Sequence, residues 1–425
     1  MTNMFRIEQL RGLEILDSRG RPTVQATCQL TGGFSGTASV PSGASTGRAE
    51  AIELRDGDPQ RYRGLGCRRA VAHVNDTLHR ALTQHPLQSQ AELDQAMLAL
   101  DGTDNKSHLG ANAMLAVSLA FARAAARQCN VPLYQHFANL LGQPLRTLPR
   151  PTINLFSGGK HAGGQSPLQD MLIVPASART MDEALAMAFA VYQSAAELIA
   201  KKYGVRLLRA DEGGLAPPFK NAEAMFEDAV AAIAAAGLKA GADVALAVDV
   251  AASHFYEEGH YHLGNDALSS RAMIEQLDRW AAHYPIVSLE DGLAEDDWEH
   301  WPELRRRLGG RMLVLGDDLL CTNPARIRRA IDARAANALL LKVNQIGTVT
   351  EALEAYRLAR ADGWRVTVSA RSGDTEDDWL ADLAVGWVGD QIKIGSITQS
   401  ERLSKYNRLL AIEAETKFPM QSWPN

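Results

Sequence analysis

Short runs of apolar residues, each followed by a charged residue, recur along the second half of the chain. We predict strands at 245–248, 286–289, 312–315, 338–341, 366–368 and 391–392. Continuous apolar runs are typical of strands that are buried on both faces, as in a parallel sheet. Segments with helical periodicity, such as 271–283 and 349–361, separate these runs. The alternation therefore predicts an α/β protein built around a barrel.

The charged residues stand where each predicted strand ends. They are Asp249, Glu290 with Asp291, Asp317 with Asp318, Lys342, Arg371 and Lys393. Ordinary charges at a solvated strand end would be the simpler explanation for any one of them. The whole series, with the acids first and the bases after, favours a functional site instead. The carboxyl ends of successive barrel strands meet at one mouth, so these side chains should converge there.

The first part of the chain has a different pattern. Residues 5–40 alternate in polarity and are interrupted by turn residues, which predicts half-buried antiparallel strands. Helical periodicity dominates from 67 to 128. A proline-containing stretch at 131–151 then indicates a boundary. We expect a smaller α+β domain at 1–135 and the barrel at 145–425.

The composition limits the class of protein. A chain of 425 residues that is 46% apolar and 22% charged is expected to form two globular domains. The formal net charge of −6 argues against nucleic acid or an anionic membrane as a partner. No segment has the length of a signal-peptide core or of a transmembrane helix. The four cysteines are widely spaced, which favours free thiols in a reducing cytoplasm.

Two glycine-rich loops are further candidates for function. The loop at 41–47, which contains Ser42, offers hydroxyls and backbone N–H groups to an anion, although a plain connector is the simpler interpretation. In the loop at 157–164, glycines on both sides of His161 favour a movable functional histidine over a packed one.

Three polar residues stand beside further predicted strands. Gln169 and Asp170 precede the run at 171–174. Glu212 follows a run at 207–209, so it is expected at another strand end.

The acids Asp249, Glu290 and Asp317 follow consecutive predicted strands and should share one mouth. Three carboxylates in a partly desolvated site repel one another unless cations offset their charge. Hard oxygen ligands without cysteine or clustered histidine suit Mg²⁺. The alternative is a structural ion-pair network with Lys342 and Lys393.

The bases suggest the chemistry. A lysine near a metal ion and another lysine should have a lowered pKa, so Lys342 is a candidate base for a proton next to a carboxylate. Glu212 would be the opposing acid that protonates a departing hydroxide. The guanidinium of Arg371 and the hydroxyl of Ser372 suit a phosphate group.

Long stretches of the chain resemble the enolase family (phosphopyruvate hydratase) in the family's order. They are ILDSRGRPTV, VPSGASTG, EAIELRDGD, DGTDNKSHLGANAMLAVSLA, GGKHAGG, DEGGLAP, VDVAAS, SLEDGLAEDDW, GDDLLCTNP, LLLKVNQIGT, SARSGDTED and QIKIGS with SERLSKYNRLL. The resemblance implies a modified (β/α)₈ TIM-type barrel with an N-terminal α+β capping domain, and a homodimer or a multiple of one. It also implies the glycolytic dehydration of 2-phosphoglycerate to phosphoenolpyruvate with two Mg²⁺. A lysine base beside Mg²⁺ is the general arrangement described for enolase-superfamily sites.

The resemblance also assigns roles to individual residues. Catalytic roles fall to Lys342, Glu212, Asp170 and His161; substrate contacts to Arg371, Ser372, Lys393, Gln169 and Ser42; and metal ligation to Asp249, Glu290, Asp317 and Ser42. Within these sets, Lys393 is expected to bind the substrate carboxylate, and His161 to close over the site.

Several positions depart from the family pattern. They are Ala370 for histidine, Asp170 for glutamate, Gly292-Leu293 for Pro-Phe, Ile394-Gly395-Ser396 for Thr-Gly-Ala, and His254 for glutamate. Because the metal ligands and the base are intact, these changes suggest a different substrate pocket. The alternative function is a paralogue that acts on a related phospho- or phosphonocarboxylate, such as carboxyphosphonoenolpyruvate synthase in phosphonate biosynthesis. A non-catalytic binding protein on the same scaffold is a third hypothesis.

Overall fold

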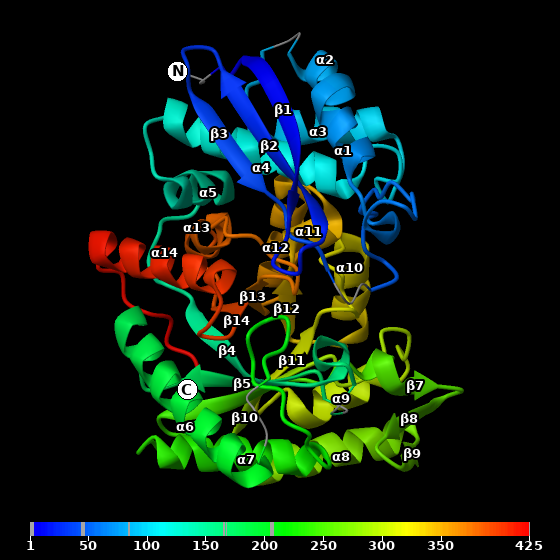
Figure 1. Ribbon diagram of the computed structural model, residues 1–425, viewed down its shortest axis with the longest axis vertical. Coiled ribbons are helices and arrows are strands. Elements are labelled where there is room, and N and C mark those ends of the chain that lie inside the picture. The colour runs from blue at the N-terminus through cyan, green and yellow to red at the C-terminus, as the bar shows by residue number, and fades with distance from the viewer. Residues whose placement is uncertain are drawn as a thin grey trace.

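The protein consists of an N-terminal α+β part and a closed barrel, which lie one above the other in Figure 1. The computed structural model describes residues 4–43, 47–83, 86–164, 166, 168–204 and 208–424. The predicted fold class, an α/β barrel with an N-terminal domain, is confirmed. The limits 1–135 and 145–425 stay a prediction.

The N-terminal part is an antiparallel sheet with helices packed behind it. Its strands, in the order in which they pair, are β1 (Ile7–Leu16), β2 (Pro22–Leu30) and β3 (Ser35–Ser39). Its helices are η1 (Tyr62–Gly64), α1 (Arg68–Ala72), η2 (His73–Leu78), α2 (His79–Leu82), α3 (Gln90–Asp101), α4 (Ala111–Gln128) and α5 (Leu133–Leu141). The buried helix α4 packs closely on this sheet because Gly36 has no side chain. A Cβ at this position would lie only 2.3 Å from the carbonyl oxygen of Ala120.

The barrel is closed by eight strands in the order β10-β11-β12-β13-β14-β4-β5-β6. These strands are β4 (Arg150–Ser157), β5 (Asp170–Pro175), β6 (Val244–Asp249), β10 (Ile286–Glu290), β11 (Leu313–Gly316), β12 (Ala338–Leu341), β13 (Arg365–Ser369) and β14 (Gln391–Gly395). The helices of the barrel are α6 (Met181–Tyr203), α7 (Ala222–Ala235), α8 (Ser270–His283), α9 (Trp301–Leu308), α10 (Pro324–Ala333), α11 (Val343–Ile346), α12 (Val349–Ala361), α13 (Trp379–Gly386) and α14 (Ser400–Thr416). After β6 come the short helix η4 (Ala252–Phe255) and a small sheet of β7 (Tyr256–Glu257), β8 (His260–Leu263) and β9 (Asp266–Leu268).

One strand of the barrel runs in the opposite direction to the others. A loop with the short helix η3 (Gly159–Ala162), instead of a crossover helix, joins β4 to β5, so β5 pairs antiparallel with both β4 and β6. The other neighbouring strands pair in parallel, as predicted for the six runs. The reversal places the first residue of β5, Asp170, opposite Asp249, the last residue of β6.

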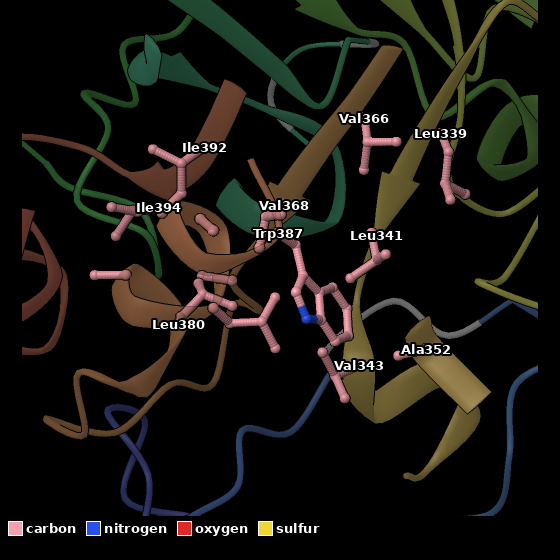
Figure 2. Close-up of a cluster of buried hydrophobic side chains, with 14 of the residues drawn as sticks. Leu339, Leu341, Val343, Ala352, Val366, Val368, Leu380, Trp387, Ile392 and Ile394 are labelled. Atoms are coloured by element: carbon pink, nitrogen blue, oxygen red, sulfur yellow. The ribbon is translucent and has the colours of Figure 1, made fainter. Parts of the chain in front are cut away.

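The barrel strands are buried on both faces, as their continuous apolar runs predicted. Alternate residues fill the interior, namely Leu172, Val174, Ala245, Ala247, Leu313, Leu315, Ala338 and Leu340, together with Trp423. The intervening residues face the outer helices. Figure 2 shows this outer layer, where Leu341, Val368 and Ile394 surround Trp387 and Leu380. Among the described residues, no helix is both long and apolar enough to cross a membrane.

The predicted strand at 207–209 is wrong for the residues that the structure describes. Leu207 lies outside them, and Arg209 forms only an isolated bridge with Leu215. Glu212 is therefore not at a strand end. It lies on a tight loop, in which the N–H of Ala210 donates to the carbonyl of Gly214 over 2.9 Å, and this loop docks on β4 through the bridge between Phe156 and Leu215.

A buried carboxylate connects the N-terminal part to the barrel. Asp94 on α3 is fully buried and accepts hydrogen bonds from the backbone N–H of Thr350, at 2.9 Å, and from its hydroxyl, at 2.6 Å, in the first turn of α12. Gln90 Nε2 donates to the other carboxylate oxygen over 3.1 Å. Burial raises the pKa of Asp94 to about 6, even though these hydrogen bonds lower it. The ion pair between Lys106 and Glu351 also crosses from the N-terminal part to α12.

The raised pKa of Asp94 gives a testable pH dependence of stability. The folded protein holds this proton up to about pH 6, whereas the unfolded chain releases it near pH 4. As the pH rises from 4 to 6, the free energy of unfolding should therefore fall by an amount on the order of 3 kcal/mol. Asp94→Asn cannot titrate. Its stability relative to the native protein, from urea unfolding, should therefore rise between pH 4 and pH 7. Asp332→Asn, which removes an exposed carboxylate of α10, is the control. A pH-independent difference for Asp94→Asn would contradict the expectation.

Candidate active site

The side chains predicted for the site come together at one end of the barrel. The parallel strands contribute their carboxyl ends, and β5 contributes its first residue because it runs the other way. In sequence order, the predicted residues that the strands carry at or just past this rim are Asp170, Asp249, Glu290, Asp317, Lys342, Arg371 and Lys393. Apart from Lys342, which is intermediate, all of them are buried.

Asp249 and Glu290 share the ammonium group of Lys393. Its Nζ lies 3.0 Å from Asp249 Oδ2 and 2.7 Å from Glu290 Oε2. Burial opposes ionisation of Asp249, but the charge and hydrogen bond of Lys393 outweigh it and lower the pKa of Asp249 to about 2. Burial and the charge of Asp249 raise the pKa of Glu290 well above its usual range. The charges of the two acids are therefore coupled, and the ammonium of Lys393 is the cation that they share.

Asp317 pairs with the proposed base. Lys342 Nζ forms a short ion pair with one carboxylate oxygen of Asp317, and Gln345 Nε2 donates to the other over 2.7 Å. The backbone N–H of Lys342 donates to Thr322 Oγ1 over 2.9 Å, and this hydroxyl donates to Gln345 Oε1 over 2.7 Å. The position of Lys342 is thus fixed at its backbone and at its amine.

The prediction of a lowered pKa for Lys342 assumed a neighbouring metal ion, and the contacts within the chain alone act in the opposite direction. Burial and the charge of Arg371 lower the pKa of Lys342, but the adjacent carboxylate of Asp317 outweighs them and raises it above its usual value. The alternative of an ion-pair network of Lys342 and Lys393 with the acids therefore describes the contacts that are present.

A different trio of acids is closest together. Among the described residues, the one group of three carboxylates with oxygens all within 4.8 Å of one another is Asp291, Asp317 and Asp318. Such a buried acidic group could hold a metal ion. The predicted set of Asp249, Glu290 and Asp317 is not gathered to this degree, so it stays a prediction.

Asp291 also has a structural role. Its two carboxylate oxygens accept hydrogen bonds from the backbone N–H groups of Asp317, at 3.0 Å, and Asp318, at 2.7 Å. Burial and the charge of Asp318 raise its pKa well above the usual range. Both oxygens are thereby engaged, so Asp291 serves to orient Asp317 at the rim.

The proposed acid lies on the loop that docks at β4. Glu212 is buried and accepts a hydrogen bond from Asn154 Nδ2 over 3.0 Å. Asp170 accepts a hydrogen bond from Ser157 Oγ over 2.6 Å, which holds its shorter side chain against β4. Gln169 Nε2 donates to Asp249 over 3.1 Å, and its buried Oε1 has no hydrogen-bond partner among the described residues.

The predicted phosphate site is built from both parts of the protein. Arg371 forms an ion pair with Glu50 of the N-terminal part, with Nη1 2.9 Å from Oε2. Ser372 Oγ accepts a hydrogen bond from Arg19 Nη1 over 3.3 Å. Ser42 pairs with Gly373 through two backbone hydrogen bonds of 2.7 and 3.0 Å. The turn after β1 and the loop after β3 thus both contact the loop that follows β13.

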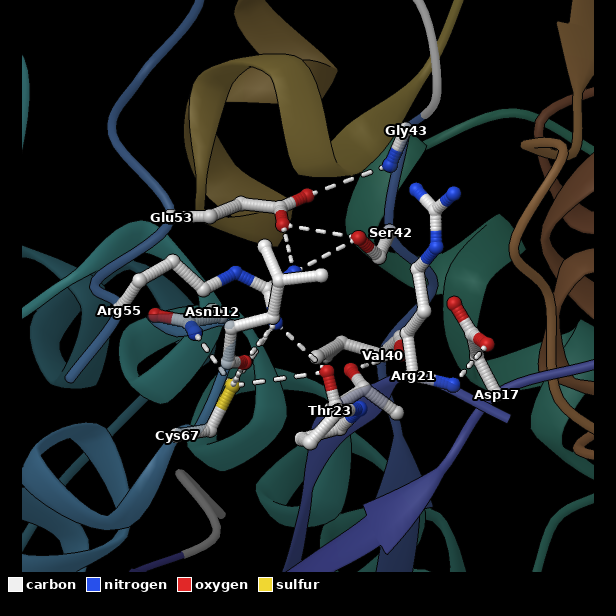
Figure 3. A network of polar contacts seen from close by, with 12 residues as sticks. Asp17, Arg21, Thr23, Val40, Ser42, Gly43, Glu53, Arg55, Cys67 and Asn112 are labelled. Carbon is white, nitrogen blue, oxygen red and sulfur yellow. Dashed lines mark hydrogen bonds and ion pairs between the residues drawn. The ribbon is translucent and has the colours of Figure 1, made fainter. Parts of the chain in front are cut away.

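The hydroxyl of Ser42 is already hydrogen-bonded in the N-terminal part. It donates to Glu53 Oε2 over 3.0 Å and accepts from Arg55 Nη2 over 2.7 Å (Figure 3). Arg55 also contacts Cys67 Sγ at 3.1 Å, which fixes the guanidinium from the other side. This network positions Ser42 next to Gly373, two residues after Arg371.

Two parts of the prediction cannot be compared with the structure. Residues 44–46 of the glycine-rich loop lie outside the described residues, and so does the side chain of His161, whose backbone belongs to η3.

Three residues at the site were not predicted. Arg19, Glu50 and Gln345 contact Ser372, Arg371 and Asp317, respectively. All three lie inside stretches that resemble the enolase family, namely ILDSRGRPTV, EAIELRDGD and LLLKVNQIGT. These residues could therefore have been found by asking which polar residues in such stretches had no assigned role.

The departures from the family pattern separate into two groups. Asp170 and Ala370 lie at the rim, whereas Gly292 and Ile394 are explained by packing. A Cβ at Gly292 would lie 2.9 Å from Leu289 Cδ2 and 3.0 Å from Leu277 Cδ1. Ile394 is 1% exposed and belongs to the outer core (Figure 2). The prediction that all these positions reshape the substrate pocket is therefore too broad. His254 lies in η4, just past β6.

Ala370 does not leave a large hole behind it. The adjacent cavity, lined also by Asn344, Trp379 and Lys405, has a volume of about 10 Å³, which is close to that of a single water molecule. The backbone N–H of Ala370 donates to the carbonyl of Lys393 over 2.8 Å, so the strand geometry is kept.

The fold and the site define a TIM-barrel protein with a capping domain and a charged mouth formed by both. The family model "Enolase, N-terminal domain" matches residues 7–137, and "Enolase, C-terminal TIM barrel domain" matches residues 145–419. The chain therefore belongs to the enolase family, as its motifs indicated. Membership of this family suggests a lyase.

The packing explanation for Gly292 can be tested by Gly292→Ala. The added methyl group would push against Leu277, Leu289 and Leu304, all buried. Overpacking of this kind should lower the free energy of unfolding by about 1–3 kcal/mol. Chemical denaturation measures it, with Gly310→Ala, at a position with open space around its Cβ, as the control. Equal stability of the two variants would contradict the explanation.

Proposed function

We propose that this protein is a Mg²⁺-dependent lyase that removes the proton next to a carboxylate and eliminates water, converting 2-phosphoglycerate to phosphoenolpyruvate. The observation that carries the proposal is the ion pair between Lys342 and Asp317, because it sets a candidate base beside an acid of the predicted metal set. Glu212 lies on the loop docked at β4, which is three strands away from β12 in the order of the barrel. Base and acid on two sides of one mouth are what an elimination requires.

The residues at the mouth fit a magnesium ion. Asp249, Glu290 and Asp317 offer hard oxygen ligands, and the ammonium of Lys393 already occupies the position of a cation between two of them. The buried Oε1 of Gln169 is a further acceptor oxygen beside Asp249. Asp249, Glu290 and Asp317 would hold one ion, and Ser42 would contribute to a second. When bound, Mg²⁺ stabilises the negative charge that develops on the substrate carboxylate.

The residues of the chain would divide the reaction between them. Lys342 takes the proton from the carbon next to the carboxylate, and the electron pair of that C–H bond forms the new double bond. The C–O bond at the neighbouring carbon breaks, and Glu212 protonates the departing hydroxide to give water. Arg371 and Ser372 bind the phosphate and Lys393 the carboxylate, while His161 closes over the site.

A second candidate function is supported by Asp170 and Ala370. The carboxylate of Asp170 is held against β4 by Ser157, and Ala370 lacks an imidazole that family members have at this position. A mouth changed at two positions could accept a related phospho- or phosphonocarboxylate, as in carboxyphosphonoenolpyruvate synthase. The enolisation step by Lys342 would be the same.

A steady-state assay tests the proposal. Purified protein with Mg²⁺ should convert 2-phosphoglycerate to a product with the ultraviolet absorbance of an enol phosphate, and a chelator should abolish the conversion. Lys342→Ala should lower kcat by about 10²–10⁴-fold, because a positioned general base is lost. Glu354→Gln, which removes an exposed carboxylate of α12, is the control.

The outcomes separate the candidates. Turnover of phosphonocarboxylates but not of 2-phosphoglycerate would favour the second function. If Lys342→Ala changed no activity with any of these substrates, the lyase would be ruled out in favour of a binding protein.

We further propose that the protein is a cytoplasmic homodimer, or a multiple of one. Leu13 and Leu16 of β1 are more than half exposed. Leu16 borders a cleft of about 680 Å³ between the N-terminal sheet and residues 374–378. Sedimentation velocity should show a dimer that Leu13→Asp weakens, and a monomer at all concentrations would contradict this.

A further inference from the structure

The anion site contains an acid that has no place in the chemistry proposed above. Glu50, from the N-terminal part, forms a two-pronged ion pair with Arg371, with Nη1 2.9 Å from Oε2 and Nη2 3.2 Å from Oε1. The side chains of Arg371 and Glu50 are only 2% and 7% exposed. Water cannot readily replace either partner, so the ion pair has a defined geometry.

A second residue holds the same end of the guanidinium. Asn344 Oδ1, on α11, accepts a hydrogen bond from Arg371 Nη1 over 3.2 Å. Glu50 and Asn344 together therefore use both N–H groups of Nη1. Because a guanidinium is planar and rigid, fixing its Nη1 end also fixes the direction in which its Nε edge points.

The N-terminal part approaches Arg371 closely at Nη2. A Cβ at Gly43 would lie 2.0 Å from Nη2 and 3.2 Å from Nε, so no residue with a side chain fits here without displacing the guanidinium. The acid itself is also held in place. Glu50 Oε1 accepts a hydrogen bond from the N–H of Gly47 over 3.0 Å, and Gln345 Nε2 lies 3.5 Å from it. Glu50 is therefore a fixed element of the site.

We propose that Glu50 is a positioning residue that holds the Nη end of Arg371, so that the guanidinium is oriented toward the phosphate or phosphonate group of the substrate. The identity of the substrate rests on the proposed function, but the binding of a tetrahedral oxyanion does not. An opposite role is conceivable for an acid at this place, namely competition with the anion for Arg371. The two roles make opposite predictions.

Inorganic phosphate is the probe, and isothermal calorimetry on the full chain is the measurement. Glu50→Gln removes a negative charge near the anion, which by charge alone would strengthen phosphate binding. We expect Kd to rise about tenfold or more instead, because glutamine accepts through one oxygen only and its NH₂ group faces an N–H of Arg371. Displacement of a binding group by about 1 Å can cost up to about 10²-fold.

A matched control comes from the same interface. Glu295 of the barrel accepts a hydrogen bond from the backbone N–H of Arg48 over 3.1 Å, whereas the guanidinium of Arg371 contacts Glu50 and Asn344. Glu295→Gln removes the same charge and should change Kd less than twofold. Asn344→Ala, which removes one hydrogen bond to Nη1, should raise Kd about threefold, and it replaces Glu50→Gln if that variant does not fold.

Kinetics separate positioning from general damage. With 2-phosphoglycerate, Glu50→Gln should raise KM about tenfold or more while kcat changes less than threefold, because Arg371 contacts the phosphate and not the reacting carbon. Glu50→Asp, which keeps the charge, should recover part of the affinity.

Four results would overturn the proposal. They are tighter phosphate binding by Glu50→Gln, equal effects of Glu50→Gln and Glu295→Gln, a fall in kcat without a change in KM, and no phosphate binding by the native protein. If the native protein binds phosphate and Glu50→Gln weakens it, but 2-phosphoglycerate is not turned over, the proposed function fails and the role of Glu50 stands.

Discussion

The site depends on the mutual neutralisation of charges that the barrel buries at its mouth. Lys393 lies between Asp249 and Glu290, Lys342 pairs with Asp317, and Arg371 pairs with Glu50. Removing one member of such a pair leaves an uncompensated charge out of water, which costs far more than an exposed ion pair gains. Each of these cations is also a group expected to meet substrate. Ligands must therefore offer charges that replace the internal partners.

The capping domain is part of this balance of charges. Glu50 and Arg19 extend from the N-terminal part to Arg371 and Ser372, and Asp94 fixes the same part to the first turn of α12. A buried carboxylate is tolerated there because backbone and hydroxyl donors surround it. The two parts are thus connected by buried polar contacts, which place Glu50 and Arg19 beside Arg371 and Ser372.

The sequence predicted the parts of the molecule that follow from local pattern. The barrel strands β6 and β10 to β14, and the alignment of Asp249, Glu290, Lys342 and Lys393 at one rim, follow from apolar runs with charged ends. It could not show the direction of β5, because strand direction depends on the connection and not on the strand's own residues. Nor could it show Glu50 against Arg371, a contact between residues 321 positions apart. The ion pair between Lys342 and Asp317, whose charge raises the pKa of the lysine, is likewise a contact that no local pattern predicts.

The reversed strand has a consequence for how the mouth can vary. In an ordinary strand–helix unit, the segment leaving the rim must lead into a helix that returns to the opposite end of the barrel. The connection at 158–169 begins at the end of β4 and ends at the start of β5, and both of these lie at the rim. It therefore does not have to return to the opposite end of the barrel. Its length can change without moving any other strand. Relatives on this scaffold can therefore gain or lose residues over the mouth of the barrel while the strands that surround it are unchanged.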